Sequence, residues 1–299
     1  MDKHRIVCAG EVMIEMAAIP GQPGHFIQGV GGDTFNTAIY LARAGLRVDY
    51  LTKLGDDEFS DTIIEQLEHE GIGSQLITRL PNRTPGLYAI ENDANGERRF
   101  AYWRDNSPAR ELFDTPIQLP VVNAFYFSGI TLAVTRSGHA NLVDLLAGLV
   151  DAGCKVIFDP NYRPQLWHSD YQARDLTDSV LAYCDTVLTT LADDTGMWGI
   201  STPEQCRDFY ADYNVRETII KAPDLTAHAY IDGGHQHRQA QKLTAVDTTG
   251  AGDAFNAGYL AARMANASVE AALEAGQALA ARVVLHPGAV LARDADAIV

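Results

Sequence analysis

Short apolar runs rich in β-branched residues alternate with longer amphipathic stretches along the whole chain. The short runs predict strands at 5–16, 48–54, 124–129, 155–159, 186–191, 217–221 and 227–232. Helical periodicity predicts helices at 34–44, 57–70, 138–152, 170–183, 203–213, 253–265 and 269–285. This alternation is typical of an α/β protein, so we expect a three-layer sandwich with a mainly parallel sheet covered by helices on both faces.

One region interrupts the alternation. Residues 86–104 contain two β-like runs around the turn signal at 93–96, with no helical pattern between them, which predicts a hairpin. Residues 14–30 are also non-helical and are punctuated by Gly and Pro. We expect these two segments to pair into a small β-sheet that projects from the core and acts as a lid. The remaining sequence shows no repeat or linker, so a single domain is expected over 1–299.

The charge balance narrows the range of partners. The chain has 39 acidic and 23 basic residues, a net charge of -16, and no basic cluster. Such a protein repels nucleic acid and anionic membranes, so neither is expected as a partner. An anionic substrate would need a few well-placed Arg or Lys side chains.

The sequence also bears on the compartment. There is neither an apolar run of ~18 residues nor a signal-peptide pattern, and we expect a cytoplasmic protein. The four cysteines have no paired spacing and are expected to be free and buried.

The run at 246–258 carries the clearest chemical signal. Gly250 and Gly252 stand directly before a predicted helix, whose first N–H groups and dipole attract anions. A Walker loop is absent, and Phe255 stands where a dinucleotide fingerprint needs a small residue. Ordinary helix capping also explains an acid at this place. Asp253 would have a catalytic role, however, if it takes the proton of a hydroxyl group during phosphoryl transfer.

Residues 247–258 resemble the C-terminal signature of the ribokinase-like (PfkB) carbohydrate kinases, and residues 31–38 resemble their sugar-binding signature. The run at 159–167 and the lid hairpin are also similar to that family. The resemblance covers nearly the whole chain in the expected order. It implies a ribokinase-like fold and an ATP-dependent sugar kinase.

The resemblance also implies roles for individual residues. Asp253 would be the catalytic base. The N–H groups that stabilise the transferred phosphoryl group would belong to Gly250, Ala251 and Gly252. The sugar hydroxyls would contact Gly32, Asp33 and Asn36. The nucleotide side would include Asn161, Thr190, Lys221, Thr226, Gly250, Gly252 and Gly288.

Cation sites are implied in the same way. Asp193, with Asp194 as its competitor, would be linked to Mg²⁺, while Asp247 and Thr249 resemble positions that hold a monovalent cation such as K⁺. Two departures from the family pattern stand out. Residues 190–193 replace the usual Asn-x-x-Glu, and no glycine follows the strand at 217–221, which leaves the geometry of the phosphate loop open.

The lid strands and the run at 159–167 are similar to the branch of the family that phosphorylates 2-keto-3-deoxygluconate. Tyr88 and Tyr102 would form walls of the sugar site, and Arg104 and Arg163 would face one cleft. A carboxylate is well matched by the planar fork of Arg, whereas a neutral sugar needs no guanidinium. Arg163 can equally serve the ATP phosphates.

Two other functions stay open. The first is a kinase for a neutral sugar, of the fructokinase or ribokinase type. The second is a non-catalytic sensor of sugar or nucleotide, against which the intact Asp253 argues. A homo-oligomer is compatible with the sequence but not indicated by it. His235 and His237 lack a third metal ligand in the sequence and are expected at a solvated hairpin tip.

Overall fold

The computed structural model describes residues 4–19, 21–92 and 98–293. In these residues a nine-stranded sheet forms the core, in the order β13-β12-β11-β10-β9-β8-β1-β4-β5. Seven neighbouring strands, from β5 to β11, run parallel, and β12 and β13 add an antiparallel hairpin at one edge. The strands are β1 (Arg5–Ala9), β4 (Arg47–Leu54), β5 (Ile77–Arg79), β8 (Ala124–Ser128), β9 (Lys155–Asp159), β10 (Thr186–Thr190), β11 (Glu217–Lys221), β12 (Thr226–Ile231) and β13 (Gly234–Gln239).

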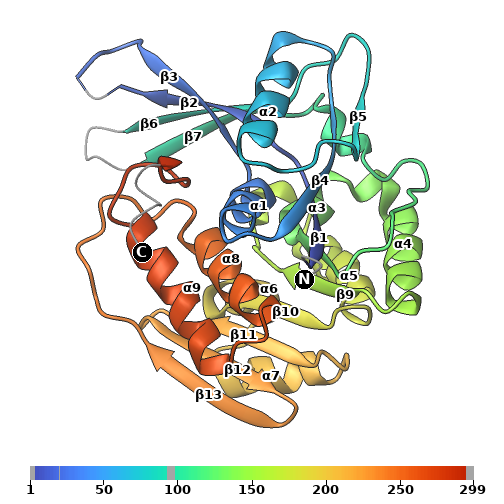
Figure 1. The fold of residues 1–299 in the computed structure, drawn as a ribbon, viewed down its shortest axis with the longest axis vertical. Coiled ribbons are helices and arrows are strands. Elements are labelled where there is room, and N and C mark those ends of the chain that lie inside the picture. The colour runs from blue at the N-terminus through green and yellow to red at the C-terminus, as the bar shows by residue number, and fades with distance from the viewer. Residues whose placement is uncertain (1–3, 20, 93–97, 294–299) are drawn as a thin grey trace.

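Helices cover both faces of this sheet (Figure 1). One face carries α1 (Asp33–Arg43), α2 (Glu58–His69), α8 (Ala251–Met264) and α9 (Val269–Val283). The other carries α3 (Gly129–Val134), α4 (His139–Asp151), α5 (Asp170–Leu181), α6 (Leu191–Trp198) and α7 (Pro203–Ala211). Successive side chains of a strand point to opposite faces, so in β1 Ile6 and Cys8 enter the first core while Val7 and Ala9 enter the second. The predicted three-layer sandwich is confirmed.

A separate four-stranded sheet extends away from the core, at the upper left of Figure 1. It consists of β3 (Phe26–Gly31), β2 (Met13–Ala18), β6 (Leu87–Asn92) and β7 (Arg98–Trp103), in that spatial order. The predicted pairing of 14–30 with 86–104 is confirmed by the parallel ladder between β2 and β6. The turn predicted at 93–96 lies outside the described residues. Closure of this lid and a single domain over 1–299 stay predictions.

Several predicted elements were wrong in detail. The strand predicted at 5–16 is two strands, β1 and β2, which belong to different sheets. The chain leaves the core at Gly10, where a Cβ atom would lie 2.4 Å from Oγ1 of Thr34. Helices α3 and α6 were missed because each follows a strand without a loop. Ser and Thr are favoured N-cap residues, so Ser128 and Thr190 were signals of these helix starts in the sequence. In the structure each side chain accepts a hydrogen bond from the backbone N–H three residues later.

The edge hairpin also differs from the prediction. Its turn is at Asp232 and Gly233, which both have positive φ, and His235 and His237 lie within β13 rather than at the tip. A third imidazole, His228, lies on β12 and stacks on His235 with ring centroids 5.4 Å apart. Across the described ranges, no group of three His, Cys, Asp or Glu side chains is arranged to hold a metal ion.

All four cysteines are free and buried, as expected. The helices in the described part of the chain include none that is long and apolar enough to span a membrane. Three short 3-10 helices complete the fold: η1 (Pro108–Glu111), η2 (Arg136–Gly138) and η3 (Pro164–Leu166).

The close approach of Gly129 to the backbone of Pro160 leads to a prediction about stability. A Cβ atom on Gly129 would lie 1.9 Å from the carbonyl oxygen of Pro160, so Gly129→Ala must displace backbone. We expect it to lower the free energy of unfolding by about 1–3 kcal/mol. Gly148, in the exposed face of α4, has no atom within 4 Å of such a Cβ. Gly148→Ala is therefore the matched control and should stabilise by about 0.5–1 kcal/mol. Urea unfolding of both variants measures the difference, and equal stability would contradict the packing argument.

Candidate active site

The two signatures found in the sequence meet where α1 and α8 begin. Asn36, in the second turn of α1, donates a hydrogen bond of 2.9 Å from Nδ2 to Oδ2 of Asp253, in the first turn of α8. Thr37 donates to the backbone oxygen of Asp253 at 3.3 Å. The fold therefore joins the predicted sugar-binding segment to the predicted base, although 217 positions separate Asn36 from Asp253.

The turn before α8 has the shape of an anion site. Gly250 adopts φ 72° at the N-cap, and no side chain caps the helix. The N–H groups of Gly252 and Asp253 lie in the first turn, where helix geometry provides no acceptor within the helix. A Cβ atom on Gly250 would lie 2.6 Å from Cβ of Ala289, so the turn has no room for a side chain.

Asp247 holds the turn against the C-terminal loop. Its carboxylate accepts from the N–H of Thr249 at 3.0 Å and from the N–H of Gly288 at 2.5 Å. Two of the predicted residues, Thr249 and Gly288, thus both bond to a third, Asp247, which is buried.

Behind this turn lies a cluster of three carboxylates: Asp33, Asp159 and Asp253. Each accepts a hydrogen bond from a different asparagine. Asn36 serves Asp253, Asn161 donates to Asp33 at 3.1 Å, and Asn256 donates to Asp159 at 2.7 Å. Asn161 was predicted on the nucleotide side, and its amide also contacts Asp33 of the predicted sugar-binding turn.

Lys221 reaches this cluster through an amide. Its Nζ donates to Oδ1 of Asn256 at 2.8 Å and to the carbonyl of Leu188 at 3.3 Å. Asp159 and Asn256 were not among the predicted site residues. Asp159 begins the run at 159–167 that resembles the family, but the sequence gave no sign that the carboxylate of Asp159 would be buried.

Loss of hydration dominates the electrostatics of the cluster. It raises the pKa of Asp253 to about 8, with the charge of Asp33 adding to the rise and the hydrogen bond from Asn36 opposing it. Burial also raises the pKa of Asp159 to about 6, which Lys221 opposes. Carboxylates that share one site cannot all ionise cheaply. Asp253 therefore carries a proton over much of the neutral range and is a stronger base than an ordinary aspartate when ionised.

Two tyrosines, Tyr88 and Tyr102, face each other on the lid strands β6 and β7. Tyr88 donates to Oε2 of Glu15 at 2.5 Å, and its ring lies 5.8 Å from that of Tyr102. The negative charges of Glu15 and Asp253 help to raise the pKa of Tyr88, after the larger effect of burial. Tyr88 therefore lies within electrostatic range of the predicted base. Glu15 was missed in the sequence because it is one polar residue in an apolar strand run.

The two predicted arginines differ in their surroundings. Arg104 is buried, forms an ion pair with Glu11, and lies over the ring of Tyr102 at 5.7 Å. The side chain of Arg163 is 47% exposed, with Nη1 3.6 Å from Oδ1 of Asp193. Burial raises the pKa of Tyr102, and the charges of Arg104 and Arg163 oppose this rise. Both arginines therefore lie within electrostatic range of Tyr102.

The remaining nucleotide-side residues are spread over the neighbouring loops. Thr190 caps α6 and donates to Oδ2 of Asp193 at 2.6 Å. Asp194, the competitor of Asp193, is fully buried against the hydroxyl of Tyr210 and belongs to the core. Thr226 is buried at the start of β12, where its N–H donates to Asp224.

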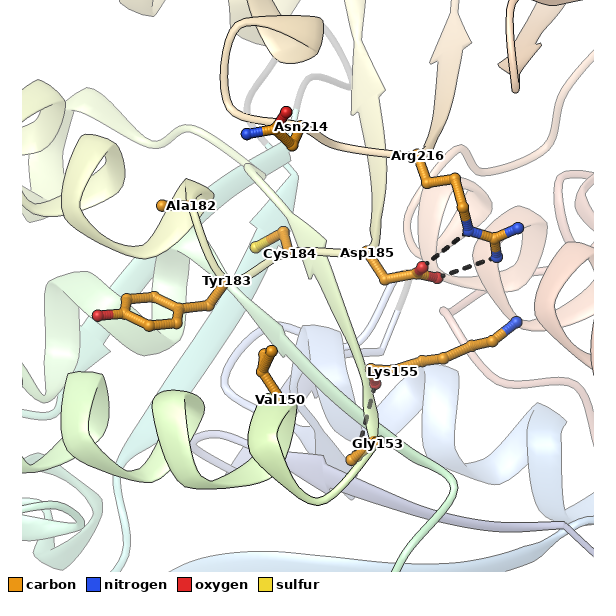
Figure 2. A pocket seen from close by; sticks show the side chains of 10 residues that line it. Val150, Gly153, Lys155, Ala182, Tyr183, Cys184, Asp185, Asn214 and Arg216 are labelled. Atoms are coloured by element: carbon orange, nitrogen blue, oxygen red, sulfur yellow. Dashed lines mark hydrogen bonds and ion pairs between the residues drawn. The ribbon is translucent and has the colours of Figure 1, made fainter.

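A surface pocket lies at the other end of the sheet (Figure 2). Lys155, Asp185 and Arg216 line it at the amino ends of β9, β10 and β11, with Nε of Arg216 bonded to Asp185 at 3.0 Å. In parallel sheets ligands bind at the carboxyl ends of the strands. This pocket is thus separate from the carboxylate cluster.

Comparison with known proteins agrees with this arrangement. A glycine turn at the start of α8, a buried carboxylate cluster beside it and a separate small β-sheet are the features expected of a phosphotransferase that acts on a hydroxyl group. The sequence model of a protein family described as "pfkB family carbohydrate kinase" matches residues 3–295 of this chain. The chain belongs to this family and is an ATP-dependent carbohydrate kinase.

Relatives and solved structures extend this finding. The chain is 37% identical to a 2-dehydro-3-deoxygluconokinase from Dickeya dadantii, over 99% of both chains. It is 36% identical to a protein of that name from Escherichia coli K12, over 97% of this chain and 98% of that one. The crystal structure of a Thermotoga maritima 2-dehydro-3-deoxygluconokinase superposes with a TM-score of 0.84 at 22% identity, over 97% of this chain and 95% of that one. The likeness to the Thermotoga maritima structure shows that the two chains share a fold.

The raised pKa of Asp253 predicts a pH profile. If Asp253 must be ionised, kcat/KM should rise with pH and level off above about pH 8. Asp33→Asn removes a charge that raises this pKa, so the midpoint should move to lower pH even though overall activity falls. Asp144→Asn, on the exposed face of α4, should leave the midpoint unchanged. Rates measured from pH 6 to 9 test this, and an unmoved midpoint in Asp33→Asn would contradict the coupling.

Proposed function

We propose that this protein transfers the γ-phosphoryl group of ATP to a hydroxyl of 2-keto-3-deoxygluconate, also called 2-dehydro-3-deoxygluconate. The observation that carries the sugar-acid assignment is the placement of Arg104 and Arg163 within electrostatic range of Tyr102. In a protein of net charge -16, two guanidinium groups near one lid residue favour an anionic substrate. The relatives named 2-dehydro-3-deoxygluconokinase support the same substrate.

Asp253 acts as the base in this proposal. The substrate hydroxyl gives its proton to Asp253 while its oxygen bonds to the γ-phosphorus, and the bond to the ADP oxygen breaks. The backbone at Gly250, Ala251 and Gly252 stabilises the charge of the transferred group. Gly32, Asp33 and Asn36 hold sugar hydroxyls. Oδ1 of Asn36 is buried without a hydrogen-bond partner and lies on the amide that bonds Asp253, which suits an acceptor for a sugar hydroxyl.

The nucleotide and the cations occupy the neighbouring loops in this proposal. Residues that would face ATP are Asn161, Thr190, Lys221, Thr226 and Gly288. Asp193 is the acid proposed to be linked to Mg²⁺, since it is partly exposed and Mg²⁺ takes most of its ligands from phosphates and water. Bound Mg²⁺ would neutralise phosphate charge.

Asp247 and Thr249 would hold a monovalent cation such as K⁺. A Vibrio cholerae fructokinase of the same fold was crystallised with fructose, ADP and potassium ion. A cytoplasmic location, where ATP is available, belongs to the same proposal.

The base assignment predicts a specific loss. Asp253→Asn keeps the side-chain shape but cannot take a proton, so kcat should fall by roughly 10²–10⁴-fold with little change in either KM. Steady-state kinetics with 2-keto-3-deoxygluconate and ATP measure this. Thermal unfolding of the variant serves as the folding control. A kcat close to that of the wild type would remove Asp253 from the role of base.

A neutral-sugar kinase is the second candidate, and one observation favours it. Both arginines already have acidic neighbours, Glu11 and Asp193, which reduce the positive charge available to a substrate. The chain is also 30% identical to a Klebsiella pneumoniae fructokinase, over 86% of this chain and 83% of that one.

Removal of the exposed arginine separates the two candidates. Arg163→Ala should lower kcat/KM for 2-keto-3-deoxygluconate by roughly 10–200-fold, as expected for loss of a charge-assisted hydrogen bond. The wild type should use fructose poorly, and the variant should use it about equally poorly. Arg216→Ala, an exposed arginine also paired with an aspartate but at the far end of the sheet, is the matched control. Equal wild-type kcat/KM for fructose and the sugar acid would overturn the acid assignment. A raised KM for ATP alone would instead assign Arg163 to the phosphates.

A further inference from the structure

Two connections at the root of the lid are joined by a buried ion pair. Glu11 lies between β1 and β2, and Arg104 directly follows β7. Oε2 of Glu11 accepts a hydrogen bond from Nη2 of Arg104, and the two residues are 2% and 8% exposed. A Cβ atom on Gly32 would lie 2.5 Å from the carbonyl oxygen of Glu11, so Glu11 packs directly beneath the predicted sugar-binding turn.

The hydrogen bonding of this pair is incomplete. Oε1 of Glu11 and Nε of Arg104 are both buried and have no hydrogen-bond partner. Buried charges are costly to desolvate, and a pair that serves stability alone should satisfy most of its polar atoms. The Glu11–Arg104 pair therefore does not have the features of a purely structural ion pair.

The same protein contains a structural pair for comparison. Arg43 donates from Nε and Nη2 to the two carboxylate oxygens of Glu70, at 2.9 and 2.7 Å, and from Nη1 to the carbonyl of Leu291 at 2.8 Å. Both side chains are about as buried as those of Glu11 and Arg104. Arg43 is thus held at three nitrogens, whereas the Glu11 carboxylate holds Arg104 at one.

We propose that Glu11 is a positioning residue for substrate recognition: it fixes the guanidinium of Arg104 over Tyr102 so that its remaining donors are directed to the carboxylate of the sugar acid. The inference rests on the proposed function, in which Arg104 binds that carboxylate. Because the pair lies at the root of the lid, Arg104 is oriented by the core segment that carries Glu11, before any movement of the lid. Glu11 also offsets the charge of Arg104 until the substrate arrives.

Kinetics of Glu11→Gln test the proposal. The variant keeps the size of the side chain but loses the charge that orients Arg104. We expect KM for 2-keto-3-deoxygluconate to rise about tenfold or more, with kcat within about threefold and KM for ATP unchanged. Glu11→Asp keeps the charge at a shorter reach and should recover part of the loss. Glu70→Gln, in the structural pair, should lower the unfolding temperature without changing either KM.

The outcomes separate this inference from the proposed function. An unchanged sugar-acid KM in folded Glu11→Gln, while Arg104→Ala raises it, would overturn the role of Glu11 alone. An unchanged KM in both variants, or no turnover of the sugar acid by the wild type, would overturn the role of Arg104 as well. If Glu11 acts through Arg104, adding Glu11→Gln to Arg104→Ala should change KM less than twofold. Should Glu11→Gln fail to fold, Glu11→Asp carries the test, and a wild-type KM together with a lowered unfolding temperature would then make the pair structural.

Discussion

The candidate active site depends on three neighbouring carboxylates, of which Asp159 is buried while Asp33 and Asp253 are partly exposed. Each would repel the others if all were ionised, and each is held by the amide of a separate asparagine. An amide can donate to a carboxylate without neutralising it, so the pKa values of Asp159 and Asp253 stay raised despite these hydrogen bonds. The packing of α1, β9 and α8 creates this cluster, because each element supplies one of the aspartates and α1 and α8 also supply two of the asparagines.

The lid adds aromatic and charged groups to the candidate site. Its strands bring Tyr88 and Tyr102 within electrostatic range of groups in the core, and its root carries the buried pair of Glu11 and Arg104. An apolar wall with a few oriented charges is typical of sites that bind small polar molecules. In the proposed function, the core would provide the proton acceptor and the anion site, and the lid would provide the contacts that distinguish one sugar from another.

Much of the fold could be predicted from the sequence because its signals are local. The hydrophobic period predicted the layers, and Gly250 and Gly252 marked the turn before α8. The break at Gly10 was hidden, because residues 5–16 read as one apolar run and only the packing of Thr34 and Thr131 in the folded chain excludes a side chain there. The roles of Glu11, Glu15 and Asn256 were also hidden. Each is a single polar residue in an apolar surrounding, and its partner is distant in the sequence, so only the folded chain brings the pair together.

The bond between Asn36 and Asp253 also has a consequence for biosynthesis. A ribosome delivers the predicted sugar-binding turn well before the predicted base, because 217 positions separate Asn36 from Asp253. Helix α1 must wait for α8, and Tyr40 and Arg43 bond to the carbonyls of Ala289 and Leu291, which emerge later still. A nascent chain that has formed β1, β4 and α1 therefore holds an exposed apolar helix face without its partner. Incomplete chains would be incapable of catalysis and dependent on protection from association until the last helices arrive.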